Sequence, residues 1–233
     1  DLSRAILDGA AISGGALADR PFSLIGASAV GTNFLTIDFS QTLLGDSGVT
    51  QPDFTTAIFE GAVFRGVDLQ YMDFTGSRFS GVDFSDTKLD CTSFRNTVWN
   101  RVSFDRADSS RPSAPCAVRG PDFSGAQFQR AEFFEVSLVD SSFRGARADD
   151  TRWSGTISGG DWTGAEIVGS SSFDFLRLSF VNLTEALLNV TVNGVTFEDV
   201  NLSGAVLTFD PADATWIRTT CPNGITQSSP CLL

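Results

Sequence analysis

The sequence predicts an all-β repeat protein, a solenoid wound from units of five residues. Three observations predict this fold class. A large apolar residue recurs at every fifth position from Phe34 to Phe104 without an exception. The residue two positions before it is mostly small or β-branched, and polar residues and glycine fill most of the remaining positions. Neither an α-helix nor a β-strand has a period of five, so the pattern indicates a stacked repeat architecture.

The large residues of the repeat are expected to form the core. Because 42% of the chain is hydrophobic, an unbroken run of fifteen apolar residues at one spacing is not a chance result. The fifteen residues are Phe34, Phe39, Leu44, Val49, Phe54, Phe59, Phe64, Leu69, Phe74, Phe79, Phe84, Leu89, Phe94, Trp99 and Phe104.

The unit reads A/S/T/V–D/N–L/F–S/T/R–G, as the stretch from Val67 to Ser85 illustrates. This pattern resembles the pentapeptide-repeat family over most of the chain. The resemblance implies a right-handed quadrilateral parallel β-helix, in which each unit forms one side of a square and 20 residues complete a coil. A narrow prism cannot hold two large side chains on each side, which explains why large and small inward residues alternate. Glycine suits the corners because it tolerates positive φ.

The β-helix is expected to span residues 1–207, with interruptions near 18–23 and a loop at 108–120. After the loop the period resumes at Phe123, Phe128 and Phe133, and one-residue shifts begin at Ile157. About ten coils at the usual strand spacing of about 4.8 Å predict a rod about 45 to 50 Å long. The alternative is a globular all-β domain of short strands.

Four cysteines suggest two disulfide bonds. Cys91 occupies a corner, and Cys116 lies in the proline-containing loop that is expected to leave the coil directly above it. Adjacent coils lie about 4.8 Å apart, close to the Cα separation of a disulfide, so we predict a Cys91–Cys116 bond. The alternative is two free thiols.

Residues 208–233 are expected to form a C-terminal cap. Pro222, Asn223 and Gly224 give a strong turn signal, and Cys221 and Cys231 suit a small disulfide loop. Some exported pentapeptide-repeat proteins are similar, ending in Cys-Pro-Asp/Asn-Gly and a final Cys. The last coil of a solenoid must be covered to prevent end-to-end stacking. The apolar residues proposed for this lid are Trp216, Ile217, Leu232 and Leu233.

The composition limits the chemistry of the protein. A net charge of −12 disfavours direct binding of nucleic acid, and no apolar run is long enough to span a membrane. Histidine is absent, which removes Ser-His-Asp and Cys-His constellations. We therefore predict no catalytic residue, no cofactor and no metal site.

Three residues form a candidate column of acidic and amide side chains. Asn33, Asp53 and Asp73 each precede a large residue and are spaced by 20, so they are expected to stack on one face. Stacked carboxylates suit a hydrolase or a bound cation. The simpler interpretation, which we favour, is that the repeat prefers Asp and Asn at this position.

Some apolar residues occupy outward positions, and they suggest a modest protein-binding patch. Ile58 and Val98 are expected on one face two coils apart, and Leu43 and Val63 next to each other on another. Scattered apolar surface is also normal for a soluble protein. The outward apolar residues are Leu35, Leu43, Ile58, Val63, Tyr71 and Val98.

These features favour a non-enzymatic structural or interaction scaffold. The paired cysteines suggest export to an oxidising compartment, either secreted or in the periplasm and cell envelope of a bacterium. The single methionine is Met72, so Asp1 is expected to follow a removed leader or a trimmed end. The expected partner is a protein or a cell-envelope polymer, bound by a monomer rather than a dimer.

The resemblance also offers an alternative function. Fluoroquinolone-resistance members of the family are acidic rods that bind DNA gyrase, a type II topoisomerase, as mimics of duplex DNA. The net charge of −12 agrees with this alternative. Those proteins, however, dimerise through a C-terminal helix, whereas this chain ends in a turn bounded by two cysteines.

Overall fold

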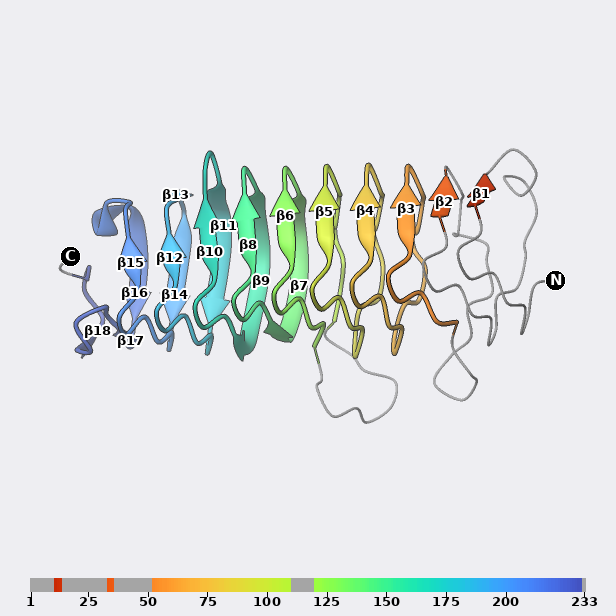
Figure 1. Ribbon diagram of the computed structural model, residues 1–233. Coiled ribbons are helices and arrows are strands. Elements are labelled where there is room, and N and C mark those ends of the chain that lie inside the picture. Colours follow the sequence, from red (N-terminus) through yellow and green to blue (C-terminus); the bar gives the residue numbers. More distant parts are fainter. Residues whose placement is uncertain (1–10, 14–32, 36–51, 110–119, 232–233) are drawn as a thin grey trace.

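The fold is a parallel β-solenoid whose short strands stack along one axis (Figure 1). The computed structural model describes residues 11–13, 33–35, 52–109 and 120–231. Apart from a single 3₁₀ turn, η2 (Pro211–Asp213), regular structure in these ranges is β-strand. None of the described segments forms an apolar helix of membrane-spanning length. The predicted all-β solenoid is confirmed.

The largest sheet has ten strands and runs along one side of the rod, with one strand from each coil. All its neighbouring strands are parallel, for instance β3 with β4 in register Phe59 to Phe79. Eight of the ten strands belong to the continuous stack that starts at β3. In stacking order they are β1 (Ala11–Ser13), β2 (Asn33–Leu35), β3 (Ile58–Glu60), β4 (Arg78–Ser80), β5 (Val98–Asn100), β6 (Gln127–Gln129), β8 (Arg147–Asp149), β10 (Glu166–Val168), β12 (Leu187–Leu188) and β15 (Val206–Leu207).

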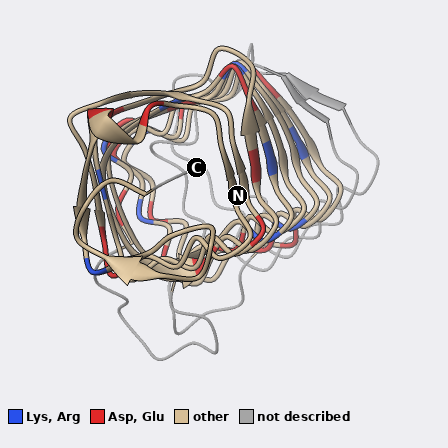
Figure 2. Ribbon diagram, turned by 90° about the vertical axis from the view of Figure 1, so that its left-hand side faces the viewer, with Lys and Arg blue, Asp and Glu red and all other residues tan. Residues whose placement is uncertain are grey.

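A coil has four sides, as the resemblance implies. Between Asp53 and Asp108, parallel bridges recur at every fifth residue and each partner lies 20 residues further on, so four units complete one turn. The four bridge rows of one coil start at Asp53, Ile58, Val63 and Asp68. Viewed along the axis, the chain traces a four-sided outline with acidic and basic residues distributed around it (Figure 2).

The remaining strands form a second parallel sheet and a terminal hairpin. Three strands of the second sheet are long because they continue around a corner of the coil. In stacking order the sheet contains β7 (Glu132–Ser142), β9 (Arg152–Asp161), β11 (Ser172–Ser179), β14 (Val195–Glu198) and β16 (Ala214–Ile217), and β13 (Thr191–Asn193) also pairs with β11. The antiparallel hairpin contains β17 (Thr219–Thr220) and β18 (Thr226–Gln227).

The core consists of columns of stacked aromatic rings along the axis. Phe74 lies between Phe54 and Phe94 with centroid distances of 5.2 Å on both sides, and the rings are nearly parallel. In the next column Phe79 stacks on Phe59 at 5.0 Å and on Trp99 at 4.1 Å. Burial of each such ring stabilises the fold by about 1.5 to 3 kcal/mol, so the columns supply the main driving force for coil stacking.

The predicted core residues point inward wherever the structure describes them. Those that are at most 2% exposed are Phe54, Phe59, Phe64, Leu69, Phe74, Phe79, Phe84, Leu89, Phe94, Trp99, Phe104, Phe123, Phe128 and Phe133. Phe34 belongs to β2, but its side chain lies outside the described residues, as does the whole of Phe39. The fourth column is aliphatic through Leu69, Leu89, Leu138, Ile157 and Leu178, and Ser109 takes one of its slots.

The predicted stacking of Asn33 with Asp53 and Asp73 is wrong. Asp53 does pair with Asp73, but Asn33 pairs with Ile58 in the ten-stranded sheet. The chain between paired residues here is 25 residues long, five more than a regular coil. One additional unit between β2 and β3 therefore moves Asn33 to the neighbouring side of the rod.

The C-terminal end closes with one further coil and a hairpin. Parallel pairing continues beyond Leu207, since Phe197 pairs with Trp216 and their rings stack at 4.8 Å. The segment predicted as the cap, 208–233, thus includes the last coil. A turn after Cys221 then reverses the chain, with the amide of Gly224 donating to the carbonyl of Cys221. β18 returns antiparallel to β17 and covers this edge.

Candidate functional site

Among the described residues, three phenylalanines break the rule that large residues point to the axis. Phe180 is 64% exposed and lies apart from the other two, Phe134 and Phe175, which line one hollow. Phe134 follows the inward Phe133 and is 51% exposed, and Phe175 lies two residues after the inward Phe173 and is 73% exposed. An exposed ring gains nothing from the core, so both side chains are available for contacts outside the coil. The sequence pattern does not single them out, because the five-residue repeat assigns only the inward positions. The signal that could have found them is an aromatic residue outside its slot.

Both rings flank a hollow of about 370 Å³ on the same side of the rod. Phe134 comes from β7 and Phe175 from β11, and β9 lies between them. At the usual strand spacing, the two backbones are about 10 Å apart. The hollow is lined by Asp105, Glu132, Phe133, Phe134, Arg152, Trp153, Ser154, Asp174 and Phe175.

The hollow arises from a one-residue slip in the repeat. Ile157 follows Trp153 at the fourth position instead of the fifth, so the corner of this coil is one residue short. Ser154 and Gly155 occupy the corner, and the pairing of β7 with β9 shifts its register there. Small side chains on the middle coil, between two coils that carry phenylalanines, leave the surface depressed.

Gly155 is required at the short corner. Its φ is +106°, and a Cβ atom at this position would lie 2.2 Å from the carbonyl oxygen of Val136. Ser154 contributes a second local contact, because its hydroxyl accepts a hydrogen bond of 2.8 Å from the amide of Glu135. These contacts hold the middle coil close against the coil that carries Phe134.

The hollow is acidic. Arg152 is its single basic residue, and the Nη1 atom of Arg152 lies 3.6 Å from Oε1 of Glu132. Neither Asp105 nor Asp174 forms an ion pair with any described residue, although Asp174 accepts a hydrogen bond of 2.8 Å from Ser172. Oδ1 of Asp105 is buried and accepts no hydrogen bond within the described part of the chain. A buried carboxylate oxygen without a donor is costly, so the negative charge of Asp105 is poorly compensated within the described part of the chain.

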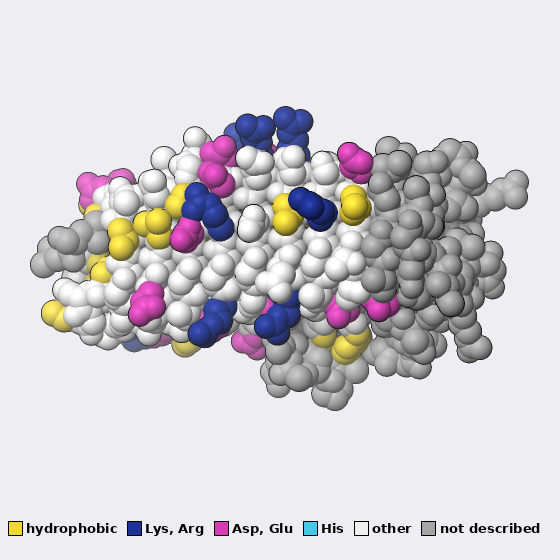
Figure 3. Space-filling model, viewed as in Figure 1, with side chains coloured by type: hydrophobic (Ala, Val, Ile, Leu, Met, Phe, Trp, Pro, Cys, Tyr) yellow, Lys and Arg dark blue, Asp and Glu magenta, His cyan; other side chains and the backbone are white. Residues whose placement is uncertain are grey.

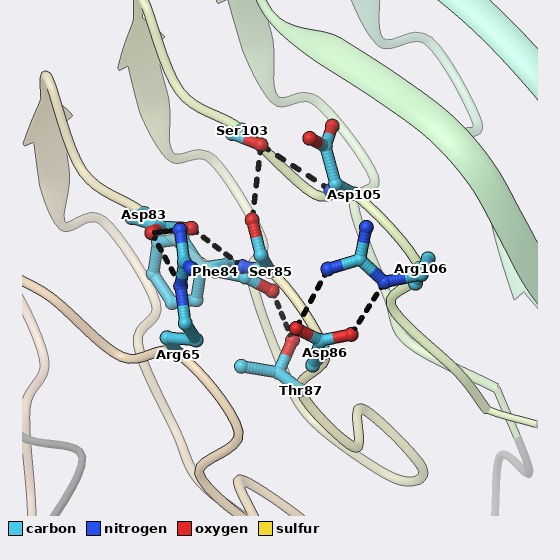
Figure 4. A network of polar contacts seen from close by, with 9 residues as sticks. All are labelled: Arg65, Asp83, Phe84, Ser85, Asp86, Thr87, Ser103, Asp105 and Arg106. Carbon is cyan, nitrogen blue, oxygen red and sulfur yellow. Dashed lines mark hydrogen bonds and ion pairs between the residues drawn. The ribbon is translucent and has the colours of Figure 1, made fainter.

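Other acidic residues of the same side are already paired (Figure 4). Arg65 donates to Asp83 at 2.8 Å, and Arg106 donates to Asp86 at 2.7 Å. Burial opposes ionisation of Asp83, but hydrogen bonds from Ser85 and Arg65 outweigh it and lower the pKa of Asp83. The hydrogen bond from Arg106 likewise lowers the pKa of Asp86. Figure 4 shows the carboxylate of Asp105 without such a partner.

The acidic column through Asp53 and Asp73 has a local structural explanation. Oδ1 of each residue accepts a hydrogen bond of 2.9 Å from the amide two residues later, in Thr55 and Thr75 respectively. Asp122 and Asn201 bond in the same way in later coils. This turn-stabilising bond accounts for the preference for Asp and Asn before the large residue. No cluster of three or more metal-binding side chains occurs within residues 52–109 and 120–231.

The predicted apolar patch lies on the ten-stranded sheet. Ile58 and Val98 are 37% and 36% exposed and share one row two coils apart, with Arg78 between them. Figure 3 shows hydrophobic side chains along this face interrupted by charged ones. These residues are less exposed than the two phenylalanines and lie on another side. Leu43 lies outside the described residues, so the predicted pair with Val63 stays a prediction.

The cysteines differ in how far the structure describes them. Cys221 and Cys231 form a disulfide with a Cα separation of 5.5 Å, and both are buried at the C-terminal end. Cys91 sits at a corner with a φ of +61° and is itself in a disulfide, whereas its predicted partner Cys116 lies outside the described residues. Of the proposed lid residues, Trp216 is buried in the last coil and Ile217 is half-buried, while Leu232 and Leu233 lie outside the described range.

Comparison with known families agrees with this architecture. The family model described as Pentapeptide repeats matches with eight copies, at residues 50–81, 57–96 and 77–108. Residues 50–108 thus match the pentapeptide-repeat family. The matched residues form the most regular coils of the rod, which stack directly beneath the coils that carry the hollow.

Solved structures of pentapeptide-repeat proteins resemble the chain along most of its length. HetL from the cyanobacterium Nostoc sp. strain PCC 7120, involved in regulation of heterocyst differentiation, is 18% identical with a TM-score of 0.39, and the match covers 96% of this chain and 92% of HetL. Full-length QnrB1, a plasmid-mediated fluoroquinolone resistance protein, is 15% identical with a TM-score of 0.33, covering 92% and 90%. A comparison with curated proteins found no match.

Proposed function

We propose that this pentapeptide-repeat protein is a non-enzymatic, exported interaction scaffold that binds a protein partner at the hollow flanked by Phe134 and Phe175. The observation that carries the proposal is the exposure of these two rings, 51% and 73%, around a hollow of about 370 Å³. Exposed aromatic residues in a depression are typical anchors of protein interfaces. The disulfide between Cys221 and Cys231 supports export to an oxidising compartment.

Site-specific photo-crosslinking tests this function. A photoreactive phenylalanine analogue replaces Phe175 in the full chain, which is expressed in its own host and irradiated. We expect one discrete adduct with a protein, and we expect Phe134→Ala to abolish it. The matched control carries the analogue at Phe180, which is 64% exposed but does not line the hollow. An adduct of equal yield from position 180, or none from position 175, contradicts the proposal.

The alternative, an acidic mimic of duplex DNA that binds a type II topoisomerase, is favoured by the net charge of −12. Ten ion pairs between described residues weaken it, because they neutralise many of the acidic side chains. A gyrase supercoiling assay separates the two functions. Inhibition at micromolar protein supports mimicry, and no inhibition removes it.

A further inference from the structure

We infer that the hollow holds a guanidinium group, the side chain of an arginine presented by the protein partner. The inference rests on the proposed function and adds the chemistry by which the partner is recognised. Three features of the hollow carry it: the spacing of the two phenylalanines, the sign of the charge and the poorly compensated carboxylate of Asp105.

The spacing suits a flat guest. Phe134 and Phe175 project from β7 and β11, whose backbones lie about 10 Å apart on either side of β9. Stacked planar groups lie about 4.5 to 7 Å apart, so the spacing of the two strands leaves room for one flat layer between side chains that project from them. Ser154 and Gly155 beneath keep the space open, since neither has a side chain long enough to fill it.

The charge selects a cation. Three acidic residues line the hollow against one arginine, and that arginine lies beside Glu132. Asp105 and Asp174 are left without an ion pair among the described residues. An anion would be repelled here, and a neutral apolar group would leave both carboxylates without a counter-charge.

Among cations, arginine fits better than lysine. A guanidinium is planar, stacks on aromatic faces and carries five N–H donors, so it can stack on Phe134 or Phe175 and donate to Asp105 at the same time. The ammonium of lysine is a compact, strongly hydrated charge that does not stack. The carboxylate of Asp105 lines the hollow without an ion pair among the described residues, so it is the acceptor that this geometry leaves for the guest.

The test is an NMR titration of the full-length oxidised protein with the tripeptide N-acetyl-Gly-Arg-Gly-amide. The probes for comparison are its citrulline and lysine counterparts and tri-N-acetylglucosamine, which stands for a cell-envelope polymer. We expect saturable shifts confined to the hollow with the arginine peptide, and about tenfold weaker binding of the citrulline peptide, which has the same shape without the charge. Equal binding of arginine and citrulline, no saturable shift, or tighter binding of the sugar each overturns the inference.

Three variants locate the site. Phe134→Ala and Phe175→Ala are expected to weaken arginine binding about fivefold to tenfold, and Phe180→Ala is expected to leave it unchanged. Asp105→Asn keeps the volume of the side chain and removes its charge. It should therefore reduce the difference in affinity between the arginine peptide and the citrulline peptide. If Phe180→Ala weakens binding as much as Phe175→Ala, the site is not the hollow.

The result also separates this inference from the proposed function. The crosslinking and NMR results can differ. If position 175 gives an adduct that depends on Phe134 but the peptides show no preference for arginine, the scaffold function is supported and the guanidinium inference is rejected. Loss of both signals removes both.

Discussion

At the scale of single residues, the register of the repeat decides what a phenylalanine does. Phe133 and Phe134 are neighbours of the same type, yet the first is 1% and the second 51% exposed. Phe133 stacks on Trp153 at 3.8 Å and on Phe104 at 4.8 Å, whereas Phe134 projects toward solvent beside the hollow. One residue of offset therefore separates a core position from a binding position.

This contrast predicts opposite results for two adjacent substitutions. Phe133→Ala should lower the free energy of unfolding by about 3 to 5 kcal/mol, since it leaves a cavity between stacked rings. Phe134→Ala should change it by less than about 0.5 kcal/mol. Urea denaturation of both variants measures the difference. Similar losses for the two would mean that Phe134 also supports the core.

Asp90 is a buried acid whose environment opposes its charge. It is 2% exposed, and one of its carboxylate oxygens has no hydrogen bond from the described residues. Burial and then the nearby charge of Asp108 raise the pKa of Asp90 from 3.8 to about 6; Asp68 also raises the pKa, and Lys88 opposes the shift. The folded protein thus binds this proton more tightly than the unfolded chain does, and ionisation at neutral pH destabilises the fold.

The stability that protonated Asp90 contributes should be complete below about pH 4 and lost as the pH rises through about 6. Asp90→Asn should therefore raise the free energy of unfolding at pH 7, by at most about 3 kcal/mol, and give no gain at pH 4. Thermal melts from pH 4 to pH 7 measure this. Asp86→Asn is the control, because its carboxylate is held by Arg106 and the substitution should give no gain at pH 7. A gain from Asp90→Asn that persists at pH 4 would refute the assignment.

At the scale of strands and corners, one shortened turn shapes the surface of three coils. β7, β9 and β11 run continuously around the corner, and the shift of register between Phe133 and Val136 brings Gly155 against the backbone of the preceding coil. Most corner residues have positive φ and tolerate side chains, as Asp86 and Arg106 show. Gly155 differs because its neighbour leaves no space for a Cβ.

Two glycine substitutions at equivalent corners test this. Gly155→Ala would place a Cβ 2.2 Å from a carbonyl oxygen, so we expect a loss of stability well above about 1 kcal/mol, which is the usual cost of φ strain alone. Gly66→Ala, at a corner with φ of +70° and no atom within 4 Å of the added carbon, should cost only about that amount. Melting temperatures of both variants decide the matter, and equal losses would contradict the close contact.

Much of the arrangement of strands and corners could be predicted from the sequence. The five-residue period identifies the inward residues, since volume in a narrow prism permits only one large side chain per side. The one-residue shift at Ile157 could be read from the sequence, but the hollow could not. A missing corner residue produces a hollow flanked by aromatic rings only when the coils on both sides carry outward phenylalanines. The column assigned to Asn33 failed for a similar reason, because an extra unit in one coil leaves the local pattern intact and changes only which residues stack.

At the scale of the whole molecule, the last coil of the stack must be covered. Its strands are all parallel until β17 and β18, where an antiparallel hairpin replaces the next coil. Cys221 takes the inward slot that follows Leu202 in the stack and is tied to Cys231, so the tail is fixed across the open end. The cap therefore protects both the last aromatic layer and the unpaired edge.

Removing that bond should loosen the end of the stack. A Cys221→Ser, Cys231→Ser double variant should lose about 2 to 3 kcal/mol of unfolding free energy in the chain-entropy view of a short loop. It should also form end-to-end oligomers at high concentration, which light scattering detects. If the variant has the same melting temperature as the parent and remains monomeric, the hairpin alone covers the end of the stack.

The binding hollow owes its shape to the short corner at Ser154 and Gly155. Inserting one alanine between these residues restores the five-residue spacing from Trp153 to the next inward residue and should fill the depression while keeping the coil. The affinity of this insertion variant for the arginine tripeptide is the most direct measurement. We expect binding to fall below detection while the melting temperature stays near that of the parent. Binding as tight as in the parent would show that the short corner does not create the site.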